Sequence, residues 1–111
     1  MYEGHCYNNL REGRGKSFYP TGQVDYDGSW VNNEFEGQGT KYEMNGNVKY
    51  SGFWYKGQAS GLGTEYRLDG SKQYHGGFKD GFAEGYGERY DLMGQLFCKG
   101  LWKENKMICF H

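Results

Sequence analysis

The first segment whose residue types suggest chemistry is Gly13-Arg14-Gly15-Lys16-Ser17, which resembles the tail of a phosphate-binding loop. In such a loop, backbone N–H groups and the lysine hold phosphate oxygens. The first glycine of that motif would stand at position 10, where this chain has Leu10. The glycine pair also recurs every 24 residues without a following Lys-Ser, so we interpret it as a structural feature of a repeat.

Acidic residues and histidines are the next candidates for catalytic or metal-binding groups. Glu12, Glu36 and Glu84 share one position of the same period, which favours a solvated charged row along one edge over paired catalytic carboxylates. The three histidines stand at unrelated positions, which are His5, His75 and His111. We therefore expect no metal site, no cofactor and no enzymatic activity.

Cysteine usage and charge restrict the setting in which the chain works. The three cysteines are odd in number and have no C-x-x-C spacing. Cys6 and Cys98 occupy aromatic positions of the period, so we expect them to be small buried hydrophobes in an intracellular, reducing compartment. The formal net charge of −1, with acids and bases interspersed, predicts no nucleic-acid partner.

A repeat of 24 residues sets the elements that position these side chains. The chain, 1–111, reads as one repeat array, with copies starting at residues 2, 26, 50 and 74 and a partial copy from 98. The aromatic residues at fixed positions, which we expect to form a structural spine, are Tyr2, Tyr26, Trp30, Tyr42, Tyr50, Trp54, Tyr66, Tyr74, Phe78, Tyr90 and Trp102. The structural glycines at fixed positions are Gly28, Gly37, Gly39, Gly46, Gly52, Gly61, Gly63, Gly70, Gly76, Gly85 and Gly87. Glycines held in register predict ordered geometry rather than a flexible chain.

Each copy reads as strand, turn, strand, turn. The fold class is therefore all-β, an elongated single-layer antiparallel meander of tandem β-hairpins. Aromatic and polar residues alternate from Val24 to Trp30, as in a half-buried strand. An Asn or Gly three residues after each tryptophan position, and pairs such as Asn45-Gly46, mark the two turns.

The glycines within the strands need a physical reason, because glycine weakens a strand. If the first turn centres on the Asn/Gly position, Gly37 faces Trp30 across the hairpin and Gly39 faces Gly28. Rings then lie flat over bare backbone. Whether Tyr42 shares the face of Trp30 depends on a possible bulge, which the sequence leaves open.

The segment Tyr26-Asp27-Gly28-Ser29-Trp30, followed by Gly37-Gln38-Gly39 and the Asn45-Gly46 turn, resembles the MORN repeat (membrane occupation and recognition nexus). The resemblance covers the whole chain, although Cys6 and Cys98 replace aromatic residues and the period is one residue longer than usual. It implies a twisted meander with one grooved, aromatic-lined face, which at ~4.8 Å per strand would be roughly 40 Å long. It also implies a cytoplasmic, cytoskeletal or organelle-associated protein.

Three functional interpretations follow. The first is a non-catalytic scaffold or assembly protein that binds a helix or extended segment of a partner protein, or self-associates through open strand edges. Apolar residues between the framework positions, the candidates for partner contact, are Phe53, Tyr55, Leu62 and Tyr86. For Phe53 and Tyr55 the alternative is packing against their strand neighbours.

The second interpretation is a peripheral membrane or phosphoinositide-binding module, which would need a basic patch. The residues that would supply it are Lys41, Lys49, Lys56, Arg67, Lys72 and Lys79. The third is a regulatory module of a larger enzyme, because the repeat resembles segments found beside lipid-kinase and methyltransferase domains.

Overall fold

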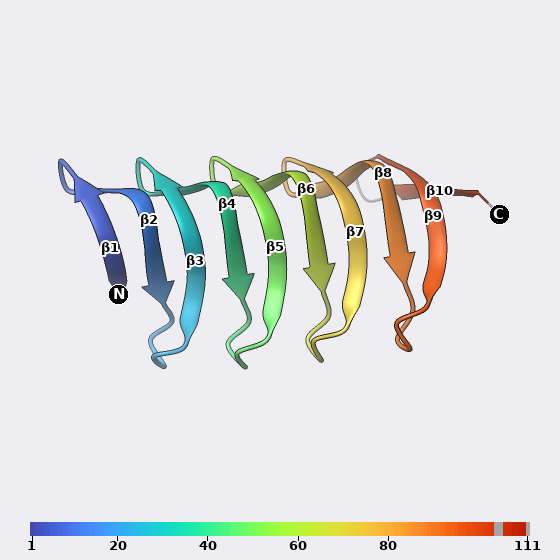
Figure 1. Ribbon diagram of the computed structural model, residues 1–111, viewed down its shortest axis with the longest axis horizontal. Coiled ribbons are helices and arrows are strands. Elements are labelled where there is room, and N and C mark those ends of the chain that lie inside the picture. Colours follow the sequence, from blue (N-terminus) through green and yellow to red (C-terminus); the bar gives the residue numbers. More distant parts are fainter. Residues whose placement is uncertain (104–105, 111) are drawn as a thin grey trace.

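The computed structural model describes residues 1–103 and the backbone of residues 106–110. It is one 10-stranded antiparallel sheet in which the strands pair in chain order, so the expected all-β meander is confirmed (Figure 1). The strands are β1 (Tyr2–Tyr7), β2 (Leu10–Phe18), β3 (Val24–Val31), β4 (Glu34–Tyr42), β5 (Val48–Tyr55), β6 (Gln58–Tyr66), β7 (Lys72–Lys79), β8 (Phe82–Tyr90), β9 (Leu96–Lys103) and β10 (Lys106–Phe110).

Alternating burial gives the sheet two different faces. In β3 the buried residues are Tyr26, Gly28 and Trp30, and the residues between them are less buried. Successive side chains of a strand point to opposite faces, so these three share one face, which we call the spine face. The other face is called the outer face.

The turns lie along two edges of the sheet, at the top and the bottom of Figure 1. At the top, both central residues of each described hairpin turn have positive φ, for example Asn32 (49°) and Asn33 (69°). This is the backbone of a type I′ turn, which Asn and Gly favour, as the sequence predicts. At the bottom, three-residue loops close with a glycine, such as Gly46 (φ 92°), whose N–H donates to the Glu43 carbonyl at 3.0 Å.

The register differs in one respect from the expectation. Gly28 pairs with Gly39 as expected, but Trp30 pairs with Phe35 and not with Gly37. A bulge between Gly28 and Trp30 adds residues to β4, and Gly37 instead pairs with Trp54 of the next hairpin. The expectation for Gly37 was wrong because the sequence does not reveal where a bulge inserts residues.

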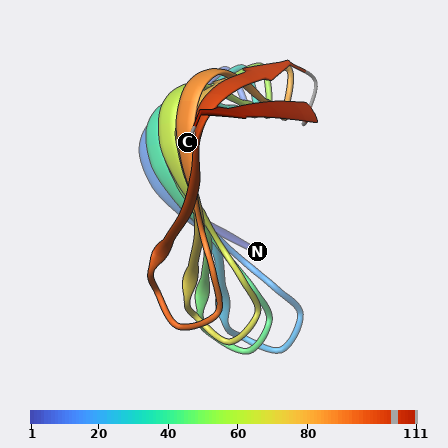
Figure 2. The ribbon, with the colours of Figure 1, turned by 90° about the vertical axis from the view of Figure 1, so that its right-hand side faces the viewer.

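The array is longer than the sequence-based estimate of roughly 40 Å. Its principal extents are 51 × 25 × 15 Å. Viewed from its end, successive strands superimpose along one bent, hook-like profile, because each repeat bends at the same bulges (Figure 2).

Candidate functional site

A continuous series of aromatic rings crosses the spine face. The series runs through Tyr2, Trp30, Tyr26, Trp54, Tyr50, Phe78, Tyr74 and Trp102, with centroids 4.9–5.6 Å apart and planes nearly perpendicular. Each edge-to-face pair contributes about 0.5–1.5 kcal/mol beyond area burial. The rings of neighbouring repeats are thereby joined into one thin core.

The tyrosines of this series are held by their own strands. The Tyr26 hydroxyl donates to the Ser29 carbonyl at 2.9 Å, and Tyr50 does the same to Phe53. To reach that carbonyl, the Tyr26 ring crosses Gly39, where an added Cβ would lie 2.0 Å from the hydroxyl oxygen. Glycine is therefore required at position 39 by space, not by backbone angle. Burial also raises the pKa of Tyr26 to about 12.

Phe35 is a core residue that the repeat pattern does not identify. Its ring stacks on Tyr26 and packs edge-on against Trp30 and Trp54. The same position of the later repeats holds Ala59 and Ala83, which pair with Trp54 and Phe78. Beside these alanines Trp54 is half-buried and Phe78 is 6% exposed, whereas Trp30 beside Phe35 is 2% exposed.

Three adjoining cavities form a groove along the spine face, which we call the spine groove. Their volumes are about 290, 280 and 330 Å³. Phe35 lines the first two cavities, and Glu65 lines the second and the third. The floor of the second cavity includes Trp54 and Ala59. The groove is thus continuous. Its half-buried aromatic residue is Trp54, which lies beside Ala59.

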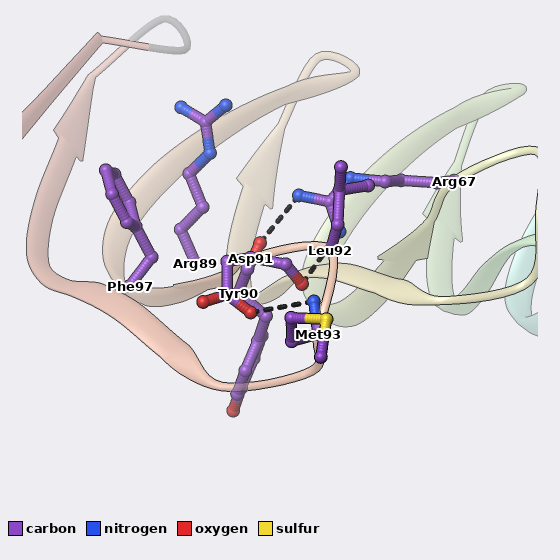
Figure 3. Close-up of a pocket in the computed structure, with 7 residues that line it drawn as sticks. All are labelled: Arg67, Arg89, Tyr90, Asp91, Leu92, Met93 and Phe97. Carbon is purple, nitrogen blue, oxygen red and sulfur yellow. Dashed lines mark hydrogen bonds between the residues drawn. The ribbon is translucent and has the colours of Figure 1, made fainter.

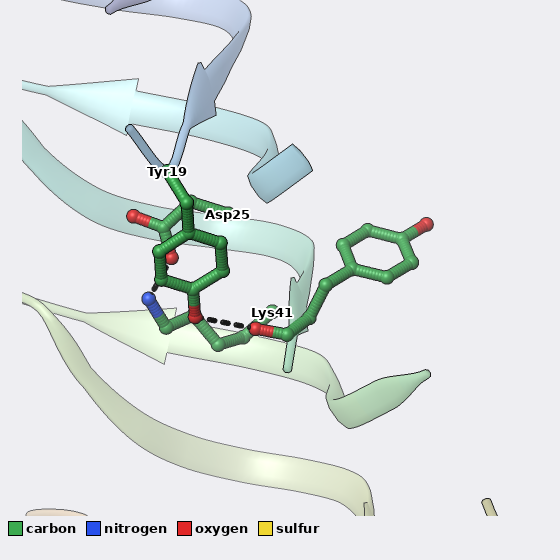
Figure 4. Close-up of polar contacts among 4 residues, drawn as sticks. Tyr19, Asp25 and Lys41 are labelled. Carbon is green, nitrogen blue, oxygen red and sulfur yellow. Dashed lines mark hydrogen bonds and ion pairs between the residues drawn. The ribbon is translucent and has the colours of Figure 1, made fainter. Parts of the chain in front are cut away.

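Charged residues form one wall of the spine groove. Lys41 makes an ion pair with Asp25, and its ammonium lies 5.3 Å from the centre of the Tyr19 ring (Figure 4). The Tyr19 hydroxyl donates to the Tyr42 carbonyl at 2.7 Å. One repeat further on, burial raises the pKa of Glu65, and the charge of Lys49 opposes that shift. The wall therefore carries both acidic and basic groups within reach of a bound segment.

The tyrosines at the other predicted spine position lie elsewhere. Tyr42 follows a bulge between Lys41 and Tyr42, and Tyr66 and Tyr90 follow equivalent bulges. All three are half-buried near the bottom loops, outside the series of ring contacts on the spine face. The Lys72 ammonium lies 5.0 Å from the centre of the Tyr90 ring. The sequence did not decide whether a bulge occurs here. The bulge is present, and it separates the Tyr42, Tyr66 and Tyr90 positions from the rings of the spine face.

The candidate contact residues between the framework positions lie on the outer face. Phe53, Tyr55, Leu62 and Tyr86 are 47%, 55%, 64% and 56% exposed. Phe53 stands between Gly52 and Trp54, whose positions belong to the spine face, so its side chain points away from the spine groove. These residues and the spine groove are consequently separate surfaces.

A further apolar surface follows the bottom loops. Pro20, Met44, Leu68 and Leu92 occupy the same position of four successive loops, and each is exposed. In the last loop, Met93 is 85% exposed beside a cavity of about 390 Å³ that Arg67, Arg89 and Phe97 also line (Figure 3). Arg67 donates to the Tyr90 carbonyl at 2.6 Å and so ties one loop to the next.

The residues that the sequence offered as phosphate-binding, acidic or metal-binding candidates have structural contacts in the sheet. Gly15 of the Gly13–Ser17 segment is in β2 under the Tyr2 ring, where a Cβ would lie 2.2 Å from the hydroxyl oxygen. Glu12 accepts a hydrogen bond from the Asn32 backbone N–H at 3.1 Å and so caps a turn. His75 bonds with Thr64 at 2.7 Å, and His111 lies outside the described residues.

Cysteine burial differs between the two predicted positions. Cys98 is buried, with 4% exposure, but Cys6 is exposed. The expectation of a buried Cys6 was wrong. Strand β1 pairs with β2 alone, and the short Cys6 side chain does not fill the space that a tryptophan fills in the later repeats.

Metal-binding clusters and membrane-spanning helices were sought in the part of the chain that the structure describes. No group of three or more His, Cys, Asp or Glu side chains converges there. Within residues 1–103 and 106–110 no helix has the length and apolar character needed to cross a membrane.

Comparison with known proteins gives one family. No curated protein matches the chain. The MORN repeat matches residues 2–24, 26–48, 50–72 and 74–91, in the register of the four copies. Repeats of this kind are generally non-catalytic and are consistent with a repeat scaffold or a membrane-binding module. With most of its length in four tandem matches, the chain belongs to the MORN repeat family.

Proposed function

We propose that this chain is a non-catalytic scaffold that holds a helix or an extended segment of a partner protein in the spine groove. The observation that carries the proposal is the half-buried Trp54 on the groove floor beside Ala59. Its indole N–H already donates to the Gly39 carbonyl at 3.0 Å, so the exposed part of the ring offers an apolar surface. Fixed aromatic side chains of this kind are preferred anchors of protein interfaces.

The repeat spacing defines the partner segment. One repeat adds two strands, which is about 10 Å along the groove. Residues three apart in an extended chain, or seven apart in a helix, lie about 10 Å apart. A segment with apolar residues at one of these spacings would place one in each repeat. Its acidic and basic residues would meet Lys49 and Glu65 on the wall.

A peptide-display selection tests this proposal. A random peptide library is panned on the wild-type chain, and binding of the enriched peptides is then measured on the double variant Ala59→Phe/Ala83→Phe. This variant fills the groove with the residue that repeat two already carries at Phe35. We expect peptides with apolar residues three or seven apart, and binding at least tenfold weaker on the filled variant. Equal binding to both proteins would refute groove binding.

A second candidate function is peripheral membrane binding through the bottom loops. The exposed aliphatic residues at the loop tips, with Arg67 and Arg89 behind Met93, are the observation that favours it. Of the other basic residues, Lys72 lies beside these arginines, over the Tyr90 ring. Lys41 and Lys49 line the spine groove instead, and Lys56 lies at a top turn. Sedimentation with vesicles containing anionic lipid, compared between wild type and Leu92→Ser/Met93→Ser, tests this candidate. Unchanged sedimentation of the variant would count against the loops.

A further inference from the structure

The outer face carries a row of apolar positions across β5 to β9, which we call the outer row. It consists of Phe53, Leu62, Gly77, Tyr86 and Leu101, one residue from each strand. Leu62 pairs with Gly77 and Tyr86 pairs with Leu101 in direct register. The four side chains of the outer row are between 47% and 64% exposed.

The first half of the array is an internal control for the outer row. The equivalent residues of β1 to β4 are polar, namely His5, Arg14, Ser29 and Gln38. Arg14 reaches across the strands to the Gln38 carbonyl, at 3.4 Å. Because the same repeat folds with polar residues at these positions, the fold does not require apolar ones in the second half. An exposed apolar surface that the fold does not require indicates a contact with another molecule.

The order of residues in the outer row has two-fold symmetry. Gly77 is central, with Leu62 and Tyr86 on its two sides and Phe53 and Leu101 beyond them. A two-fold axis through Gly77, parallel to the strands, sets Leu62 opposite Tyr86 of a second copy and Phe53 opposite Leu101. At the central glycine the space of a side chain is taken by the backbone of β8, since an added Cβ would lie 2.3 Å from the Glu84 carbonyl oxygen. We propose that the outer row is a contact between two copies of this chain, packed face to face about this axis.

Charges beside the outer row fit a second copy. The neighbouring row runs Ser51, Thr64, His75, Glu88 and Lys99 in direct register. About the proposed axis, Glu88 faces Thr64 and Lys99 faces Ser51, so no like charges meet in this row. On the other side, Tyr55 faces Lys103. On β7, which lies on the axis, His75, Gly77 and Lys79 face their own equivalents, and Lys79 is at the end of the strand, where its long side chain reaches solvent.

The available area fits a dimer of moderate affinity. Half of the 51 Å length by the 25 Å width gives roughly 600 Å² per copy as an upper limit for the contact face of this bent sheet. Stable complexes bury about 800 Å² per partner, so a concentration-dependent dimer is expected rather than a permanent one. This inference does not rest on the proposed groove function, because the groove lies on the opposite face.

Light scattering after size exclusion, over a series of protein concentrations, tests the inference. The substitutions are copied from earlier repeats of the same chain. Leu62→Gln and Tyr86→Arg introduce the residues found at the same position of earlier repeats, Gln38 and Arg14. We expect wild type to change from monomer to dimer with concentration and the double variant to stay monomeric. Its circular dichroism and melting temperature should stay close to wild type. The control Gln38→Ala changes the polar half of the same row and should leave the dimer intact.

Two results would overturn the inference. One is a wild-type chain that is monomeric at every concentration, and the other is a dimer that persists in the double variant. Gly77 itself is not a clean test, because an added Cβ would lie 2.3 Å from the Glu84 carbonyl oxygen and would disturb the fold. A peptide selected for the spine groove should bind the monomeric variant as well as it binds wild type, which keeps this test separate from that of the groove.

Discussion

The ring of Phe35 lies on the ring of Tyr26, with centroids 3.9 Å apart and planes within 8° of parallel. Phe35 also contacts Trp30 and Trp54, so its ring covers the aromatic core at the second repeat while it lines the spine groove. Ala59 and Ala83 occupy the same position of the next two repeats, where Trp54 is half-buried but Phe78 is 6% exposed. The third repeat is therefore the place where the aromatic core is accessible from the groove.

Replacement of Phe35 by alanine should destabilise the fold and open the groove. Phe35 is half-buried, so we expect a loss of about 2 kcal/mol, below the range for fully buried rings. The reverse change, Ala59→Phe, covers Trp54 and should not lower stability. Chemical denaturation of both variants measures the two effects. A destabilised Ala59→Phe would show that the third repeat lacks room for the ring, and the filled variant would then be unsuitable for the peptide test.

Trp30 and Trp54 should contribute unequally to stability. Both indoles donate to a glycine carbonyl at 3.0 Å, but Trp30 is 2% exposed and Trp54 is half-buried. We expect Trp30→Ala to cost about 3–5 kcal/mol and Trp54→Ala clearly less. Denaturant midpoints, with the slope checked for two-state unfolding, give the comparison. Equal losses would mean that burial of the indole does not set its contribution.

The sequence was sufficient for the repeat, the strand pattern and the turns because each depends on local residue types at a fixed period. Asn32 and Asn33 are a case in point, since positive φ at a two-residue turn selects such residues directly. The pairing of Gly28 with Gly39 was also expected, but it depends on the bulge, because the Asn32-Asn33 turn alone would place Gly37 opposite Gly28.

Several features that the sequence did not reveal depend on turn placement and bulges. The two-residue turn sets Phe35 opposite Trp30, and the bulge beyond it brings Gly39, and not Gly37, opposite Gly28. A second bulge moves Tyr42 away from the spine series. Inserted residues have no fixed sequence signal, and one extra residue changes which side chains meet. The groove wall could not be predicted for the same reason, because the pairing of Lys41 with Asp25 depends on that second type of bulge.

Alanine should destabilise the protein at Gly39 and at Gly94 for different physical reasons. At Gly39 an added Cβ would lie 2.0 Å from the Tyr26 hydroxyl, so Gly39→Ala displaces the ring and should unfold the second and third repeats. At Gly94 there is open space but φ is 84°, so Gly94→Ala should cost only about 1–2 kcal/mol of backbone strain. Thermal melts and near-ultraviolet circular dichroism separate the two. A small effect of Gly39→Ala on the melting temperature would contradict the tight packing of the Tyr26 ring over this glycine.

Glu65→Gln should stabilise the protein at neutral pH. Burial raises the pKa of Glu65 in the folded chain, so its ionised form disfavours folding. The stabilising effect of the protonated carboxyl is complete below the unfolded pKa and is lost as pH rises through the folded pKa. The glutamine variant should therefore melt higher than wild type at pH 7 and similarly at acidic pH. A lower melting temperature at pH 7 would show that attraction to Lys49 outweighs the effect of burial.

The spine tyrosines should make the fold sensitive to alkali. Burial raises the pKa of Tyr26, Tyr50 and Tyr74 from 10.0 to about 12. Each folded pKa lies above the unfolded one, so the stability linked to these protons is complete below pH 10 and is lost as pH rises towards 12. Absorbance of tyrosinate should thus show the spine tyrosines ionising only together with loss of the circular dichroism signal. Ionisation of these three tyrosines near pH 10, with the sheet intact, would contradict a buried spine.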